Sequence, residues 1–209
     1  YFEFNKLELS NISYIYPESK KPIIENLNLT INQGESIGII GTTGSGKSTI
    51  VDIIMCFLKP QKGKILFNGK NILDKNNKCH LIKWRRNIAH VPQQIFLKDS
   101  SIVENIALGQ SITEIDFDKL IYSCKIAKIY EFIQSTKYGL YTYVGERGIN
   151  LSGGQIQRLA IARALYRDVK VIIFDEATSS LDKKTENEVV NSLKSIYKNN
   201  LTIITIAHR

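Results

Sequence analysis

Eight consecutive residues have the composition and spacing of a phosphate-binding loop. They are Gly41, Thr42, Thr43, Gly44, Ser45, Gly46, Lys47 and Ser48, in the pattern G-x-x-x-x-G-K-S. An apolar run precedes them and a helix-like run starting at Thr49 follows, which is the strand, loop and helix context such a loop requires. Backbone N–H groups would surround a polyphosphate, Lys47 would reach its β and γ phosphates, and Ser48 would ligate Mg²⁺. The sequence therefore predicts a nucleoside triphosphate site.

Two acids follow a second apolar run. Residues 171–174 are Val-Ile-Ile-Phe, typical of a buried strand, and Asp175 and Glu176 come directly after them. In a P-loop protein the first acid at such a strand end holds Mg²⁺ through water, which we predict for Asp175. Glu176 would face the γ-phosphate and accept a proton from the attacking water. Such general base catalysis typically raises the reaction rate about 10²–10⁴-fold.

A second phosphate-binding turn begins at Leu151. The sequence there is Leu-Ser-Gly-Gly-Gln, followed by a helix-like run over 156–165. A Ser-Gly-Gly turn at a helix N-terminus offers the Ser152 hydroxyl and the amides of Gly153 and Gly154 to an anion. Two phosphate sites far apart in one chain suggest a nucleotide clamped between two copies.

The order of these motifs resembles the nucleotide-binding domain of ABC transporters over nearly all of the 209 residues. Residues 41–48 resemble the Walker A loop, and Gln93 resembles the Q-loop glutamine. Residues 151–155 resemble the signature sequence, and residues 172–175 resemble the Walker B strand. Residues 180–182 resemble the D-loop, and His208 resembles the switch histidine. The resemblance implies ATP and Mg²⁺ as cofactors. It also implies an ATPase, with catalytic roles for Lys47, Gln93, Glu176 and His208.

The resemblance also assigns ligand contacts residue by residue. Those to the nucleotide are Tyr16, Gly41, Thr42, Thr43, Gly44, Ser45, Gly46, Lys47, Ser48, Thr49, Gln93, Ser152, Gly153, Gly154, Gln155 and Asp182; those to Mg²⁺ are Ser48, Gln93 and Asp175. Tyr16 would stack on adenine, with Tyr14 as the competing candidate. His208 would bridge the γ-phosphate, the attacking water and Glu176.

The resemblance implies that two such domains pair head to tail. Ser152 and Gly154 of one protomer would then touch the γ-phosphate held by the other. Since this chain carries both the P-loop and the signature, we expect a homodimer.

We expect an α/β fold of the P-loop NTPase class, with a RecA-like parallel core, an N-terminal antiparallel β subdomain and an inserted helical subdomain. Residues 1–95 and 166–209 would form the β-rich core, and residues about 96–165, where three- and four-residue apolar steps dominate, the helical part. Strands are predicted over 169–174 and 201–206, with a helix at about 183–198 between them.

Composition describes an ordinary globular chain, 43% hydrophobic and 23% charged. Its apolar runs are far shorter than the roughly 18 residues of a membrane span. The formal charge of +8 comes from scattered lysines, so we expect no nucleic-acid partner. Three cysteines without a C-x-x-C pair indicate neither zinc nor disulfides and favour a reducing compartment. The ends of the sequence suggest a piece of a longer polypeptide.

Within the family, residues 144–148 (Val-Gly-Glu-Arg-Gly) and 92–106 resemble exporter-type members. This implies a transmembrane partner domain, absent from these residues, and a place at the cytoplasmic face of a membrane. The alternatives are an importer ATPase, a DNA-repair or chromosome-maintenance ATPase, and a non-hydrolysing cassette. The interval between the P-loop and the signature is short and contains no heptads or paired cysteines, which argues against the DNA-repair or chromosome-maintenance ATPase.

Overall fold

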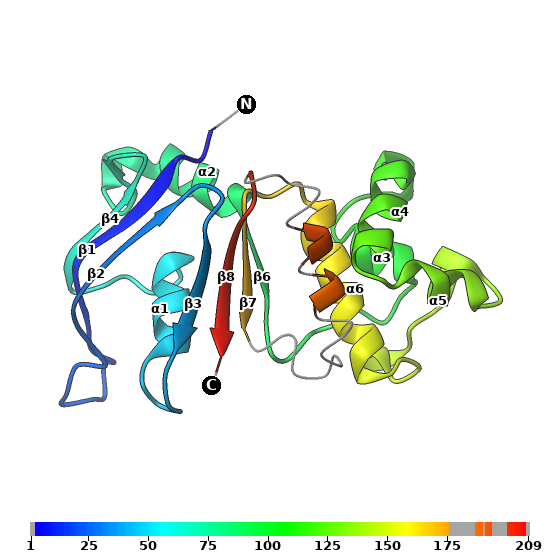
Figure 1. Ribbon diagram of the computed structural model, residues 1–209, viewed down its shortest axis with the longest axis horizontal. Helices are drawn as coiled ribbons and strands as arrows, with labels where there is room; N and C mark the ends of the chain where they lie inside the picture. Colours follow the sequence, from blue (N-terminus) through cyan, green and yellow to red (C-terminus); the bar gives the residue numbers. More distant parts are fainter. Residues whose placement is uncertain (1–2, 176–186, 190, 194–199, 208–209) are drawn as a thin grey trace. The chain divides into compact units, whose positions relative to one another are not determined.

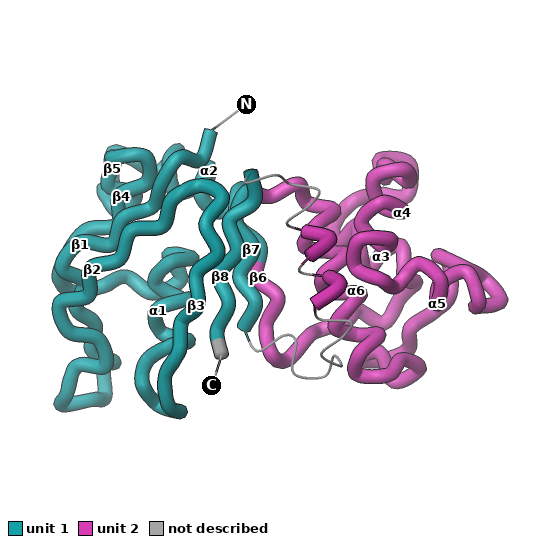
Figure 2. Tube along the Cα trace, viewed as in Figure 1, with its two compact units in different colours: residues 1–89, 170–175, 199–209 teal, residues 90–169, 176–198 magenta. Residues whose placement is uncertain are grey.

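The computed structural model describes residues 3–175, 187–189, 191–193 and 200–207. The chain divides into two compact units, drawn in different colours in Figure 2. Unit 1 comprises residues 1–89, 170–175 and 199–209, and unit 2 comprises residues 90–169 and 176–198.

The first sheet of unit 1 is antiparallel, as expected for the N-terminal part of the chain. Its strands are β1 (Lys6–Tyr14), β2 (Ile24–Asn32), β4 (Lys62–Phe67) and β5 (Lys70–Asn71), in the order β2-β1-β4-β5. Figure 1 labels the first three strands of this order, and Figure 2 also labels β5. β1 buries Leu7, Leu9, Ile12 and Tyr14. The alternation shifts by one residue after Leu9, where Asn11 has φ +51° and the register with β2 and β4 is irregular.

The second sheet contains the parallel core. Its order is β3 (Ser36–Ile40), β8 (Thr202–Ala207), β7 (Val171–Asp175) and β6 (Ile88–Val91), and both β3 and β7 run parallel to β8. Residues 171–174 are fully buried, as the apolar run predicted. A strand flanked by others in a parallel sheet is covered on both faces, which explains why the run has no polar alternation.

Two helices complete unit 1. α1 (Lys47–Ile54) follows the P-loop, and α2 (Lys78–Asn87) was not expected from the sequence. One core contains side chains from both sheets, α1 and α2. Trp84 of α2 lies wholly inside it, beside the rings of Phe4 and Phe67, and donates its indole N–H to the carbonyl of Ile54 at 2.6 Å. This contact fixes the end of α1.

Unit 2 is helical, in agreement with the apolar periodicity over residues about 96–165. Its helices are α3 (Ile102–Ile106), α4 (Phe117–Ile126), α5 (Tyr130–Ser135) and α6 (Gly153–Tyr166), with short 3₁₀ turns at Ile112–Glu114, Gly139–Tyr141 and Glu146–Gly148. α6 packs against α3 and α4. Of the helix predicted over 183–198, the described residues 187–189 and 191–193 are helical.

The helices in the described part of the chain do not reach a bilayer-spanning combination of length and hydrophobicity. The longest, α6, has 14 residues.

Candidate functional site

The P-loop connects β3 to α1 through two glycines whose backbone conformation other residues adopt only with strain. Gly46 precedes α1 with φ +91°, in the left-handed region that favours glycine. Gly44, within the loop, lies in the same region with φ +80°. No side chain caps α1, so its first N–H groups face the loop. This is the backbone arrangement that receives a phosphate.

Lys47 is folded into the loop. Its Nζ donates to the carbonyl of Gly41 at 2.8 Å and to that of Thr42 at 2.9 Å, and the residue is 7% exposed. An ammonium has three donors, so it can hold these two carbonyls and still turn toward an anion. The loop therefore carries its positive charge in place before any ligand arrives.

Asp175 lies at the same edge of the sheet as the P-loop. It is the last residue of β7 and pairs with Ile206 of β8, and the next residue of β8 pairs with Ile40, directly before Gly41. Because the strands are parallel, their carboxyl ends meet at one edge, where ligands bind in sheets of this kind. The register therefore places Asp175 at the edge of the sheet where the P-loop begins.

Two tyrosines lie on either side of Ile15 at the end of β1, and their environments differ. Tyr14 is 7% exposed and belongs to the core, whereas Tyr16 is 41% exposed. Their rings meet edge to face with centroids 5.0 Å apart. The Tyr16 hydroxyl lies 3.0 Å from the Thr49 Oγ1, which joins the exposed ring to the first turn of α1.

Ser152 caps α6 in the manner that its sequence predicts. Its Oγ accepts a hydrogen bond from the Gln155 N–H at 3.3 Å, and the Gln155 Oε1 accepts one from the Ser152 N–H at 2.8 Å. This capping box leaves the Ser152 hydroxyl hydrogen free to rotate outward. Ser152 and Gly153 are exposed, while Gly154 and Gln155 are half-buried.

Gln93 is exposed in the bend after β6, in unit 2. The segment that follows it is fixed by Asn105, which is fully buried in α3. The Asn105 side chain accepts from the Lys98 N–H at 2.9 Å and donates to the Lys98 carbonyl at 2.9 Å. The Arg163 Nη1 donates to the Phe96 carbonyl at 2.9 Å. Neither Asn105 nor Arg163 is predicted as a functional residue from the sequence, although an Asn and an Arg inside apolar helical runs are a signal of buried polar contacts.

The predicted residues divide among three parts of the molecule. Unit 1 brings together Tyr16, the P-loop with Thr49, and Asp175. Unit 2 carries Gln93 and the signature turn. Glu176, Asp182 and His208 lie outside the described residues.

The residues near the P-loop are compatible with Mg²⁺. Throughout the described residues, no group of three His, Cys, Asp or Glu side chains could hold a metal ion by itself. Mg²⁺ needs no such group when it is shared with phosphates, because one or two protein ligands and water complete its coordination. Ser48, exposed in the first turn of α1, and Asp175 at the strand end supply suitable oxygens.

Known proteins resemble this chain over almost all of its length. The sequence profile of the ABC transporter family matches residues 24–179. The "Alpha-hemolysin translocation ATP-binding protein HlyB" of Escherichia coli is 42% identical over 202 residues, 95% of this chain and 27% of that protein. The "ATP-dependent lipid A-core flippase" of Idiomarina loihiensis is 40% identical over 199 residues, 95% of this chain and 33% of that protein.

Two further matches agree. The "Multidrug resistance-like ATP-binding protein MdlA" of Buchnera aphidicola subsp. Schizaphis graminum is 40% identical over 205 residues, 98% of this chain and 34% of that protein. The solved structure of a bacterial Atm1-family ABC exporter with ATP bound superimposes with a TM-score of 0.88 at 33% identity, over 99% of this chain and 35% of that one. The chain thus spans about a third or less of these relatives. By fold and by sequence, it belongs to the ABC transporter family and is a nucleotide-binding domain of the exporter type.

Proposed function

We propose that this chain binds ATP with Mg²⁺ and hydrolyses it to power an exporter. The observation that carries the proposal is the Lys47 ammonium inside a glycine loop, at the sheet edge where Asp175 also ends its strand. An ATP-bound exporter shares the fold. Residues 41–49 would contact the triphosphate, mainly through the loop amides and the Lys47 ammonium.

Tyr16 would hold the adenine. Its exposed ring is joined to α1 through Thr49, whereas Tyr14 is buried and offers no open face. This contrast supports Tyr16 as the stacking residue. Base stacking on an aromatic side chain contributes about 1–3 kcal/mol in other nucleotide sites.

Mg²⁺ would be held by Ser48, Gln93 and Asp175 and would neutralise phosphate charge. Glu176 would orient or deprotonate the attacking water, and His208 would contact the γ-phosphate and that water. Lys47 and the loop amides would stabilise the charge that develops on the transferred phosphoryl group. These roles follow the order of motifs along the chain.

Hydrolysis would occur in a head-to-tail dimer. Residues 152–155 and Asp182 of one protomer would complete the site that the other protomer begins. The exposed cap at Ser152 supports this, because its rotatable hydroxyl and the following amides are the groups that an incoming phosphate requires.

The remainder of the transporter would supply the membrane-spanning domain, with this chain at the cytoplasmic face. The relatives are named for a hemolysin, a lipid and drugs, so they share export rather than one cargo. They support an exporter or flippase over an importer or a DNA-repair ATPase.

The direct test is the mass of the Glu176→Gln chain in solution, measured by light scattering with Mg²⁺. Blocked hydrolysis should let a dimer of twice 23.7 kDa accumulate with ATP and not with ADP. Lys47→Ala in the same background is the control and should stay monomeric. A chain that remains monomeric while binding ATP would refute the self-pairing, and normal turnover by Glu176→Gln would refute the role of that acid.

A further inference from the structure

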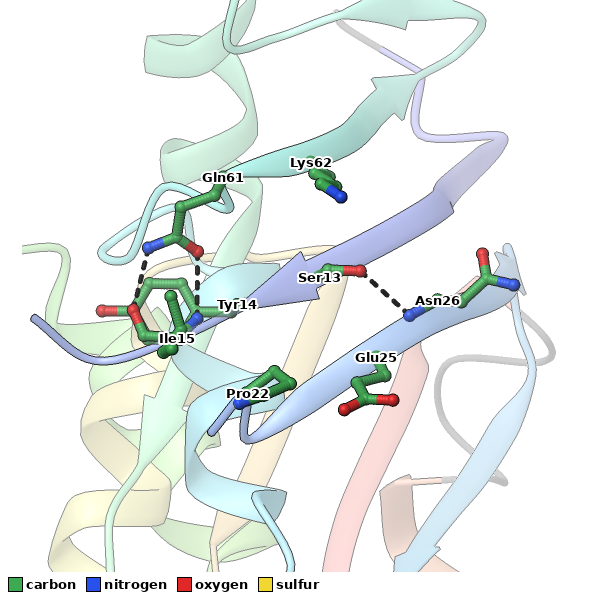
Figure 3. A pocket seen from close by; sticks show the side chains of 8 residues that line it. All are labelled: Ser13, Tyr14, Ile15, Pro22, Glu25, Asn26, Gln61 and Lys62. Carbon is green, nitrogen blue, oxygen red and sulfur yellow. Dashed lines mark hydrogen bonds between the residues drawn. The ribbon is translucent and has the colours of Figure 1, made fainter. Parts of the chain in front are cut away.

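The side-chain amide of Gln61 binds both backbone polar groups of a single residue, Ile15. Its Oε1 accepts from the Ile15 N–H at 3.0 Å, and its Nε2 donates to the Ile15 carbonyl at 2.8 Å. Figure 3 shows the two bonds side by side. The Gln61 backbone N–H also donates to the Ser13 carbonyl at 3.1 Å.

This contact continues a strand pairing beyond the point where the strands stop. The ladder of β1 with β4 ends at Ser13 and Lys62, and the ladder of β1 with β2 ends at Tyr14 and Ile24. One donor and one acceptor from the Gln61 side chain replace what a neighbouring strand would supply to Ile15. Ile15 is therefore held by hydrogen bonds although it lies one residue beyond Tyr14, where the backbone pairing of β1 ends.

The residue after Ile15 is Tyr16, whose ring has its own supports. The Tyr16 hydroxyl lies 3.0 Å from Thr49 Oγ1, and the Tyr14 ring meets it edge to face. The Tyr16 carbonyl accepts from the Ser19 N–H at 2.9 Å. These contacts fix the ring at its tip and the chain after it, and the Gln61 amide fixes the chain before it.

We infer that Gln61 is a positioning residue for Tyr16, which sets the affinity for the nucleobase and not for the phosphates. The inference rests on the proposed stacking role of Tyr16. Gln61 would not touch the nucleotide. It would act by keeping the ring aimed where a base can stack, since a ring on a loosely held chain must be ordered when the ligand binds.

Removing the Gln61 side chain should leave the fold intact. The residue is exposed and lines an open hollow of about 430 Å³ with Ser13, Pro22, Glu25 and Lys62 (Figure 3). Truncation there creates no sealed void, which is the usual source of a large loss of stability. Gln61→Met, of similar length and without the amide, tests the hydrogen bonds separately from the bulk.

The experiment compares ADP with pyrophosphate, both with Mg²⁺, by calorimetry on the 209-residue chain. Both ligands carry the phosphates, only ADP carries the base, and neither is consumed. Gln61→Ala and Gln61→Met should raise the Kd for ADP about three- to tenfold, the size expected from two exposed neutral hydrogen bonds. Pyrophosphate binding should not change. Gln33→Ala, an exposed glutamine in the turn after β2, is the matched control.

A double mutant separates the inference from the function on which it rests. In a Tyr16→Ala background, Gln61→Ala should have no further effect on the Kd for ADP. An equal loss for both ligands, or an undiminished effect in that background, overturns the positioning role. If Tyr16→Ala weakens ADP but Gln61→Ala does not, the inference fails and stacking stands. If Tyr16→Ala leaves ADP binding unchanged, stacking itself is wrong, and the inference falls with it.

Discussion

Arg163 of α6 donates hydrogen bonds to both oxygens of Asn105 in α3. Its Nε lies 2.7 Å from the Asn105 carbonyl oxygen, and its Nη2 lies 3.1 Å from Oδ1. Burial lowers the pKa of Arg163 because desolvation disfavours its charge. With the Phe96 carbonyl as a third acceptor, the guanidinium joins the signature helix, α3 and the segment after Gln93. A planar fork of donors suits this task, and a lysine would not replace it.

Asn105→Ala should lower the free energy of unfolding by about 2–3 kcal/mol, because it leaves the Lys98 N–H and the Arg163 Nη2 without their side-chain acceptor. Urea unfolding followed by circular dichroism measures the change. Asn76→Ala, at an exposed position, is the control and should be close to neutral. A neutral result at Asn105 would mean that the side-chain hydrogen bonds of Asn105 add nothing to stability.

Lys47→Ala should weaken ADP and pyrophosphate alike, by about 10- to 100-fold, since a charge-assisted hydrogen bond to phosphate is lost from both complexes. Calorimetry with both ligands gives the comparison. This pattern differs from that of Tyr16, whose loss should affect ADP alone. Lys62→Ala serves as the charge-matched control, and an equal effect there would indicate a general electrostatic contribution instead of a contact.

Ser152 permits a substitution that keeps the helix cap and introduces a negative charge. Ser152→Asp retains a good N-cap and should leave stability within about 0.5 kcal/mol, whereas Ser152→Ala should cost about 1 kcal/mol. In the Glu176→Gln background, the aspartate should abolish the ATP-dependent dimer, because it would face the partner's γ-phosphate. Thermal unfolding and light scattering report the two properties. A dimer that survives Ser152→Asp would place the phosphate elsewhere.

The cysteines should report on each unit separately. Burial raises the pKa of Cys56 in unit 1 and of Cys124 in unit 2 from 9.0 to about 12, while Cys79 is exposed. Iodoacetamide at about pH 8 should therefore modify Cys79 alone in the native chain and all three after unfolding, as mass spectrometry of the peptides would show. Rapid modification of Cys56 or Cys124 in native protein would contradict this burial.

The same two thiols should make stability fall in alkali. Their raised pKa values mean that the unfolded chain loses these protons from about pH 9 and the folded chain only near pH 12. Their contribution to stability is thus complete below about pH 9 and declines as the pH rises toward 12. Cys56→Ser with Cys124→Ser should flatten that decline in urea titrations at several pH values, and an unchanged slope would assign it to other groups.

The sequence alone determined the features in which neighbouring residues decide the structure. The glycine pattern of the P-loop, the apolar strand before Asp175 and the Ser152 cap are each set by a few consecutive side chains, and the structure confirms all three. The antiparallel first sheet and the helical unit 2 also follow from periodicity. Helix α2 was not predicted because most of its residues are polar and only one of them, Trp84, is buried, so the sequence shows no clear apolar periodicity there.

Only the tertiary structure decided which groups meet across the chain. Sequence left Tyr14 and Tyr16 as competitors, and the packing of Tyr14 into the core resolved which ring is exposed. The bonds of Gln61 to Ile15 and of Arg163 to Asn105 span 46 and 58 residues. A polar side chain has many acceptable partners, and its choice depends on which backbone groups the fold leaves unpaired beside it. That information exists only once the strands and helices have packed.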